Sequence, residues 1–238
     1  MEKGVILAGG KGTRLLPITR TQNKHLVGVL NNPMILYPIH TLKQLGVKEI
    51  MIVSGGDHIG GFAEFLMDGS DYGVSITYRV QKNAGGIADA LKLVEGFVGG
   101  DQFAVVLGDN FFADVSSTTF SADKNTVFVK MVDDPWRFGV YVEKNNTIVE
   151  KPNIREQAPA ITGLYVYNPN DIFPVLEELR PSDRGELEVT DLNNSLLKDG
   201  VLDIVKLKCF WSDMGTPESL YRTVKYVAST GRFGEIVV

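Results

Sequence analysis

Short apolar runs alternate with amphipathic segments along the first half of the chain. Continuous apolar runs predict strands buried on both faces, and apolar residues spaced three or four apart predict helices. The predicted strands are residues 5–8, 49–54, 74–80 and 103–107, with predicted helices at 33–45, 61–67 and 87–97 between them. Strands that alternate with helices in this way predict a parallel βαβ framework.

The second half has short β-rich runs separated by turn signals such as Asn145-Asn146. The predicted strands are residues 126–132, 140–143, 147–150, 161–167 and 202–207, and the predicted helices are 172–179, 187–198 and 217–229. This pattern predicts an antiparallel extension of the sheet. No linker or internal repeat interrupts the chain, so we expect one α/β domain over residues 1–238.

Composition and charge exclude some classes of protein. The chain has 238 residues, 44% of them hydrophobic and 22% charged, which is typical of a globular protein. A net charge of −5 argues against a nucleic-acid-binding protein, which needs a basic face. Residues 1–25 nevertheless carry a local charge of +4, which leaves −9 for the rest. The basic segment indicates contact with a small polyanion, unless it is a chance fluctuation in a short window.

The single cysteine and the lack of long apolar runs bear on the compartment. Cys209 excludes an intrachain disulfide, and its apolar neighbours predict a buried, inert thiol. The apolar run at residues 4–8 is too short for a signal peptide, and no run approaches the length of a membrane helix. We therefore expect a cytoplasmic protein without a membrane partner.

A glycine-rich loop directly follows the first predicted strand. It reads Leu7-Ala8-Gly9-Gly10-Lys11-Gly12-Thr13-Arg14. Glycines at the carboxyl end of a strand let backbone N–H groups approach phosphate, and an arginine can hold phosphate with two parallel donors. The spacing fits neither the dinucleotide-binding pattern G-x-G-x-x-G nor the P-loop. Taken alone, the loop could be a glycine-rich turn with a surface arginine.

Further motifs follow this loop in a fixed order along nearly the whole chain. They are Asn23-Lys24-His25-Leu26, Asn32-Pro33-Met34-Ile35, Tyr78-Arg79-Val80-Gln81, Gly85-Gly86-Ile87-Ala88, Leu107-Gly108-Asp109-Asn110, Arg137-Phe138-Gly139-Val140, Glu150-Lys151-Pro152, Thr162-Gly163-Leu164-Tyr165, Arg184-Gly185-Glu186-Leu187-Glu188-Val189-Thr190-Asp191 and Trp211-Ser212-Asp213-Met214-Gly215-Thr216. Together they resemble the sugar-1-phosphate nucleotidyltransferases, above all the short glucose-1-phosphate thymidylyltransferases, including the spore-coat-polysaccharide type.

The resemblance implies a Rossmann-like three-layer α/β/α nucleotidyltransferase fold with a mostly parallel mixed sheet and a smaller antiparallel β extension. It implies a nucleotide-binding half at about residues 1–125 and a sugar-phosphate-binding half at about 126–238. The implied reaction is attack of a sugar-1-phosphate oxygen on the α-phosphorus of a nucleoside triphosphate, with dTTP and glucose 1-phosphate as substrates and Mg²⁺ as cofactor. The nucleophile is already ionised, so no general base is needed, and positioning and charge neutralisation are the tasks left to the protein.

Residue roles follow from the same resemblance. The implied catalytic residues are Arg14, Lys24, Asp109, Lys151 and Asp213, of which Asp109 and Asp213 hold the magnesium ion. The implied nucleotide-binding residues are Leu7, Ala8, Gly9, Gly10, Gly12, Thr13, Arg14, Lys24, His25, Gln81, Gly86 and Asp109. The implied sugar-phosphate-binding residues are Asn110, Gly139, Glu150, Lys151, Thr162, Gly163, Tyr165 and Arg184.

Several of these residues also have ordinary structural explanations. An aspartate after a strand often forms a turn or a helix cap. Gln81 suits the N3–H and carbonyl edge of thymine but cannot by itself separate thymine from uracil. Glu150 and Lys151 are adjacent on a predicted strand, so their side chains should point to opposite faces unless the chain bends, for example at Pro152.

Some positions depart from the family pattern, and these departures leave substrate preference open. Gly28, Asp89, Met214 and Pro217 stand where the family usually has proline, glutamine, threonine and histidine.

The chain has no room for the carboxyl-terminal allosteric region of longer relatives, so we expect no feedback site there. UTP or another hexose 1-phosphate as substrate, and a non-catalytic nucleotide-sugar sensor, remain the alternatives. A homo-oligomer is left open.

Overall fold

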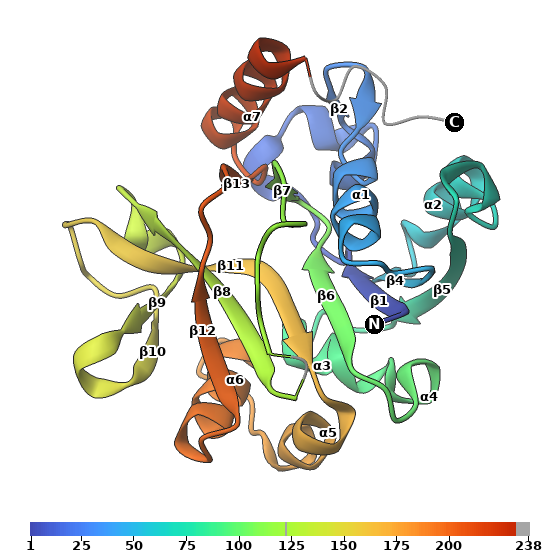
Figure 1. Cartoon of the computed structure of the whole chain (residues 1–238). Helices are drawn as coiled ribbons and strands as arrows, with labels where there is room; N and C mark the ends of the chain where they lie inside the picture. The colour runs from blue at the N-terminus through green and yellow to red at the C-terminus, as the bar shows by residue number, and fades with distance from the viewer. Residues whose placement is uncertain (122, 232–238) are drawn as a thin grey trace. The chain divides into compact units, whose positions relative to one another are not determined.

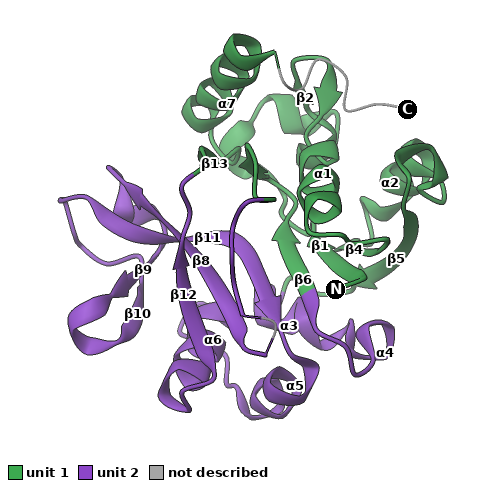
Figure 2. Ribbon diagram, in the orientation of Figure 1, with its two compact units in different colours: residues 1–84, 104–116, 209–238 green, residues 85–103, 117–208 purple. Residues whose placement is uncertain are grey.

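The computed structural model describes residues 1–121 and 123–231, which form two compact units (Figure 2). Unit 1 comprises residues 1–84, 104–116 and 209–231, and unit 2 comprises residues 85–103 and 117–208. Each unit combines chain segments that are distant in the sequence. A single domain with halves that meet near residue 125 stays a prediction.

Unit 1 contains the parallel strands predicted for the first half of the chain (Figure 1). They are β1 (Lys3–Leu7), β4 (Glu49–Gly55), β5 (Ser75–Gln81) and β6 (Phe103–Leu107, of which Phe103 belongs to unit 2), in the order β6-β1-β4-β5. Strand β4 pairs in parallel with β1 and β5, with Leu7 opposite Val53 and Gly55 opposite Gln81. Their carboxyl ends therefore meet at one edge of the sheet, where ligands of open α/β sheets bind.

Helices and a second ladder complete unit 1. Helices α1 (Leu36–Gln44) and α2 (Ile59–Leu66) contact the parallel strands, and α7 (Pro217–Thr230) packs near the short antiparallel pair β7 (Asn110–Phe112) and β13 (Trp211–Asp213). The remaining elements are β2 (Gly28–Val29), β3 (Asn32–Pro33) and the 3-10 helices η1 (Thr13–Leu15), η2 (Ile18–Arg20), η3 (Lys24–Leu26) and η4 (Ser70–Tyr72). Buried side chains that include Leu15, Met34, Tyr37, Phe111 and Met214 form a core under this ladder.

Unit 2 contains the antiparallel strands predicted for the second half of the chain. They are β8 (Asn125–Val132), β9 (Gly139–Val142), β10 (Thr147–Glu150) and β11 (Ala158–Tyr167), joined by β12 (Leu202–Lys206), which pairs in parallel with β8. The helices are α3 (Ile87–Lys92), α4 (Glu95–Val98), α5 (Pro169–Glu178), α6 (Val189–Lys198), η5 (Pro135–Arg137) and η6 (Glu143–Asn145). Helix α6 contacts β10 and β12.

The structure corrects several of the sequence predictions. The helix predicted at 33–45 begins at Leu36, because Asn32–Pro33 pair with β2 instead. The helix predicted at 87–97 is two helices, because the N–H groups of Leu93 and Val94 bond to carbonyls three residues back and so end the α-helical pattern. Cys209 is only partly buried, since it packs at the margin of the core.

The α/β class is confirmed, with a mainly parallel part in unit 1 and an antiparallel part in unit 2. No helix within the described residues is long and apolar enough to cross a membrane.

Candidate active site

The glycine-rich loop lies at the carboxyl end of β1 in unit 1. The Ala8 N–H still donates to the Val53 carbonyl at 2.8 Å, so the loop leaves the sheet only at Gly9. Gly12 has a φ of +67°, a left-handed conformation that favours glycine, and it leads into η1 with Thr13 and Arg14. A Cβ at Gly9 would lie 3.1 Å from Gln81 Oε1. The loop and the end of β5 therefore meet where the sequence predicts the nucleotide.

Lys24 reaches the same loop from η3. Its ammonium group donates to Asp109 Oδ2 at 2.7 Å, and the residue is only 8% exposed. A Cβ at Gly10 would lie 2.9 Å from Lys24 Nζ, and one at Gly12 would lie 2.8 Å from Lys24 Cβ. A side chain at either glycine would clash with the Lys24 side chain.

Two carboxylates and Arg14 meet around a third glycine. A Cβ at Gly215 would lie 3.2 Å from Arg14 Nη2, 3.2 Å from Asp213 Oδ2 and 3.4 Å from Asp109 Oδ2. The β7–β13 ladder brings the carboxylates together, because Asp213 lies opposite Asn110, the residue after Asp109. Two carboxylate ligands suit a Mg²⁺ ion that takes its other ligands from substrate phosphates and water. Within residues 1–121 and 123–231 no group of three or more His, Cys, Asp or Glu side chains could hold a metal ion.

The electrostatics keep Asp109 charged and His25 neutral. Burial alone disfavours the Asp109 carboxylate, but the Lys24 charge and the hydrogen bonds from Lys24 and Asn110 outweigh it and hold the Asp109 pKa well below its usual range. Burial, together with the Lys24 charge, lowers the His25 pKa to about 3. Asn23 Oδ1 accepts from the His25 backbone N–H at 2.8 Å and lies 2.9 Å from Nδ1. Since that oxygen accepts, the neutral ring carries its proton on Nδ1.

The buried His25 makes folding sensitive to acid. Between pH 6.5 and 3 the unfolded chain binds a proton at His25 that the folded protein does not, so stability falls as the pH falls. We expect this group to lower the free energy of unfolding by about 2 kcal/mol between pH 7 and pH 5. Urea unfolding at both values should show a smaller loss in His25→Gln than in the native chain. His58→Gln removes only the smallest contribution to the lowered His25 pKa, so this control should lose stability much as the native chain does. Equal losses in native and His25→Gln proteins would contradict the expectation.

A second polar cluster forms around Glu150 in unit 2. Glu150 Oε1 accepts from Lys151 Nζ at 3.2 Å and from Arg184 Nη2 at 3.3 Å, and Oε2 accepts from the Thr190 hydroxyl at 2.8 Å. Arg184 also donates to Glu188 Oε1 at 2.9 Å. Three residues of the predicted sugar-phosphate set, Glu150, Lys151 and Arg184, are thus in direct contact.

The sequence predicts that the side chains of Glu150 and Lys151 point to opposite faces unless the chain bends, for example at Pro152. The structure places this bend one residue earlier. Strand β10 ends at Glu150, and Lys151 has a φ of +44°, with its N–H donating to the Phe138 carbonyl at 2.9 Å. The chain therefore turns at Lys151 itself and not at Pro152. This turn lets the two neighbouring side chains form an ion pair, which the alternation of a straight strand would prevent.

Other predicted residues of unit 2 are buried in the sheet or beside it. The Thr162 hydroxyl donates to the Phe128 carbonyl at 2.8 Å, and Thr162, Gly163 and Tyr165 lie in β11, around a register shift against β8. Burial, together with the Glu150 charge, raises the Tyr165 pKa. A Cβ at Gly139 would lie 3.4 Å from Glu150 Oε2. Gly86 precedes α3 and packs against Leu187. Ligand contacts of these residues stay predictions.

Three residues around these clusters were not predicted as site residues. Glu188 accepts a hydrogen bond from Arg184, and Thr190 donates one to Glu150. Both residues lie in the motif that begins at Arg184, but no role was predicted for them. The Trp211 indole N–H donates to Asn110 Oδ1 at 2.7 Å. No local spacing in the sequence signals this contact, because Asn110 lies 101 positions away.

The family departures have local structural explanations. Asp89 is the third residue of α3, and its carboxyl group occupies the space that a Cβ at Gly85 would need. Pro217 is the first residue of α7, a position that suits proline, and Met214 is fully buried in the core of unit 1. Gly28 pairs with Pro33 and does not adopt a positive φ. None of the four removes a group of the clusters described above.

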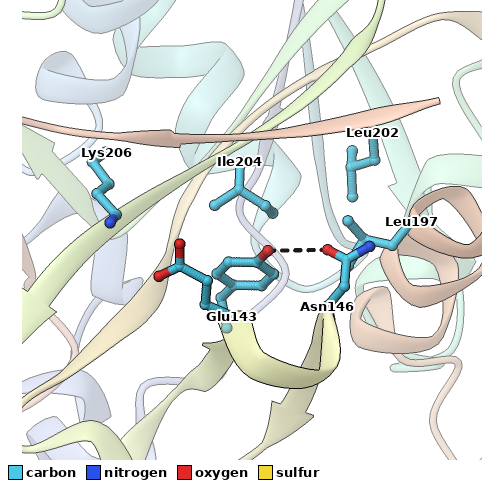
Figure 3. Close-up of a pocket in the computed structure, with 7 residues that line it drawn as sticks. Glu143, Asn146, Leu197, Leu202, Ile204 and Lys206 are labelled. Atoms are coloured by element: carbon cyan, nitrogen blue, oxygen red, sulfur yellow. Dashed lines mark hydrogen bonds between the residues drawn. The ribbon is translucent and has the colours of Figure 1, made fainter. Parts of the chain in front are cut away.

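A separate pocket of about 480 Å³ lies in unit 2 (Figure 3). Its lining comes from the β9–β10 hairpin, α6 and β12: Tyr141, Glu143, Asn146, Leu197, Leu202, Ile204 and Lys206. Figure 3 shows Lys206 and Glu143 at one end and the two leucines at the other. The Tyr141 hydroxyl donates to Asn146 Oδ1 at 3.0 Å. None of the predicted site residues lines this pocket.

A family model for nucleotidyl transferases matches residues 3–230. The chain belongs to the nucleotidyl transferase family. Among curated members, it is 42% identical over 237 residues to the glucose-1-phosphate thymidylyltransferase of Neisseria meningitidis serogroup A, covering 94% of this chain and 82% of that one. It is 40% identical to a low-salt glycan biosynthesis nucleotidyltransferase of Haloferax volcanii, covering 92% of this chain and 64% of that one.

Solved structures of nucleotidyl transferases agree with this membership. A provisionally assigned glucose-1-phosphate thymidylyltransferase of Bacillus anthracis, solved with sucrose, superposes with a TM-score of 0.88 at 43% identity and covers 99% of this chain and 98% of that one. A UDP-glucose pyrophosphorylase in complex with UDP-glucose has a TM-score of 0.81 at 22% identity over 97% of this chain and 99% of that one, which shows the fold alone. The predicted Rossmann-like nucleotidyltransferase fold is confirmed.

Proposed function

We propose that the chain is a Mg²⁺-dependent glucose-1-phosphate thymidylyltransferase, which joins dTTP and glucose 1-phosphate into dTDP-glucose and releases pyrophosphate. The observation that carries this proposal is the meeting of Arg14, Asp109 and Asp213 around Gly215, with Lys24 bound to Asp109. Relatives up to 42% identical over most of the chain carry this name.

The phosphate chemistry needs charge and alignment more than proton transfer. The attacking oxygen of a sugar 1-phosphate is already ionised, so an activating base is not required. Arg14 offers two parallel donors to a phosphate, and Lys24 offers a point charge. Backbone N–H groups of the Gly9–Gly12 loop can add donors without steric hindrance from side chains. These groups orient the α-phosphate and stabilise the charge shared by the attacking and leaving oxygens.

Asp109 and Asp213 would hold the magnesium ion. Their oxygens are the hard ligands that Mg²⁺ prefers, and their number leaves positions for phosphate and water. When bound, the ion would neutralise charge that develops on the transferred phosphoryl group. Lys24, which balances Asp109 in the structure, could then donate to a phosphate instead.

Base and sugar recognition follow from the remaining clusters. Gln81, beside Gly9, can pair its amide with the N3–H and carbonyl edge of thymine. In unit 2, Glu150 can accept from sugar hydroxyls, and Lys151 and Arg184 can bind the sugar phosphate. The cytoplasmic location stays a prediction.

Pyrophosphate release tests the proposal directly. The assay pairs dTTP, UTP and a purine triphosphate with glucose 1-phosphate and other hexose 1-phosphates, each with Mg²⁺ and with a chelator. We expect the fastest release with dTTP and glucose 1-phosphate, and none with the chelator. Faster release with UTP or another hexose 1-phosphate would keep the chemistry and change the substrate. No release with any pair would overturn the enzyme assignment and favour a nucleotide-sugar sensor.

A further inference from the structure

Both oxygens of the Asp109 carboxylate accept hydrogen bonds from buried side chains. Lys24 Nζ donates to Oδ2 at 2.7 Å, and Asn110 Nδ2 donates to Oδ1 at 3.0 Å. The amide oxygen of Asn110 in turn accepts the Trp211 indole N–H at 2.7 Å. Asn110 is 2% exposed and Trp211 is 7% exposed. A continuous chain of hydrogen bonds therefore runs from Trp211 through Asn110 to Asp109.

The chemistry of these groups allows only one orientation of the Asn110 amide. An indole N–H can only donate, and an ionised carboxylate can only accept. The amide satisfies both partners when its oxygen faces Trp211 and its nitrogen faces Asp109. The reverse orientation would place two donors together at Trp211 and two acceptors together at Asp109. Trp211 and Asp109 therefore fix together which atom Asn110 presents to the carboxylate.

The strand pairing fixes Trp211 in this position. Trp211 lies opposite Phe112, and Asp213 lies opposite Asn110, in the β7–β13 ladder. Trp211 and Asp213 are two residues apart on the same strand, so their side chains leave it on the same face. The strand that carries one proposed metal ligand thus carries the group that orients the other.

We propose that Trp211 is a positioning residue for the metal-binding carboxylate of Asp109 and that it acts through Asn110. The inference rests on the proposed function, since it assumes that Asp109 holds the divalent cation. Without the indole N–H, the buried amide oxygen of Asn110 loses this hydrogen bond, and the amide is held less firmly against Asp109. Asp109 then leaves the orientation that faces Asp213, and the affinity for the cation falls.

Trp211→Phe is the direct test, because phenylalanine keeps the aromatic ring and removes the N–H. Mn²⁺ binding without substrates, followed by electron paramagnetic resonance, should weaken about 10- to 100-fold, the usual effect of losing a residue that orients a metal ligand. The Mg²⁺ concentration that gives half-maximal turnover should rise by a similar factor, while kcat at saturating Mg²⁺ stays close to the native value. Trp136→Phe, at the other tryptophan, is the matched control and should change neither quantity.

A double-mutant cycle separates positioning from packing. If Trp211 acts through Asn110, Trp211→Phe should weaken Mn²⁺ binding in the native background and have little further effect in Asn110→Ala. Equal effects in both backgrounds would overturn the proposal, as would native affinity in Trp211→Phe. Turnover of the native protein is a separate measurement, so the proposed activity can stand while this inference fails. If Asp109→Asn binds Mn²⁺ as the native protein does, both the metal assignment and this inference are wrong.

Fluorescence gives a readout that leaves Trp211 in place. In Trp136→Phe the only tryptophan is Trp211, so the emission reports on its indole group. We expect Mg²⁺ to change that emission and Asn110→Ala to abolish the change. An emission that is unaltered at a Mg²⁺ concentration that saturates turnover would overturn the proposal, even if Trp211→Phe does not fold.

Discussion

Asp109→Asn should lower kcat/KM for pyrophosphate release by about 10³-fold, because the substitution removes the charge that a cation and Lys24 both use. Losing one group that stabilises transition-state charge commonly costs 10²- to 10³-fold. The measurement is steady-state turnover at saturating Mg²⁺. Asp71→Asn, at an exposed position of the same unit, is the control and should keep native activity.

Loss of folding must be separated from loss of chemistry in this variant. Asp109→Asn leaves the buried Lys24 without its counter-charge, which also destabilises the protein. The double variant Asp109→Asn with Lys24→Met removes both charges, so it should regain much of the thermal stability but none of the activity. Near-native turnover of Asp109→Asn would contradict the assignment and place the cation at another site.

Gly86→Ala should destabilise unit 2 by about 3 kcal/mol or more, from backbone strain and overpacking together. Gly86 has a φ of +98° and a ψ of 178°, a region almost restricted to glycine. A Cβ there would lie 2.5 Å from the Leu187 carbonyl oxygen, a backbone atom that cannot move aside easily. The Leu187 N–H donates to the Gly85 carbonyl at 2.8 Å, so a shift would also break this bond. Urea unfolding measures the loss.

Gly200→Ala is the matched control for this prediction. Gly200 also has a positive φ, of +73°, but a Cβ there would meet no atom within 4 Å. Its substitution should cost only the left-handed strain, about 1 to 2 kcal/mol. If the two variants lose the same stability, the contact with Leu187 is not the cause of the larger effect.

Hydrophobic patterning predicts the elements that carry a continuous local apolar signal. The strand over residues 103–107 has the predicted bounds, because a continuous apolar run ends there at Gly108. The β7–β13 ladder was missed, since each strand has three residues and its partner is distant in the chain, so no local periodicity exists. The break between α3 and α4 was also missed, because the apolar face continues through Val94 and Val98.

Motifs predict the charged groups of the candidate site, but only the structure gives their contacts. Arg14 and Asp213, almost 200 residues apart, both came from the family motifs, and they meet at Gly215. The turn at Lys151 was predicted one residue late, because a positive φ at a lysine has no sequence signal. The role of Trp211 depends on a hydrogen bond to a residue 101 positions away, which patterning cannot predict.

The pairing of β7 with β13 also determines when, during synthesis, the candidate site can be completed. Asp109 is synthesised about 100 residues before Asp213, and the chain between them builds most of unit 2. Domains fold progressively during synthesis, and contacts between distant segments form slowly. A nascent chain that has not yet produced residue 213 carries only one of the two carboxylates. Divalent-cation affinity should therefore emerge as a late event in biogenesis and serve as a reporter that the final strand of unit 1 has docked.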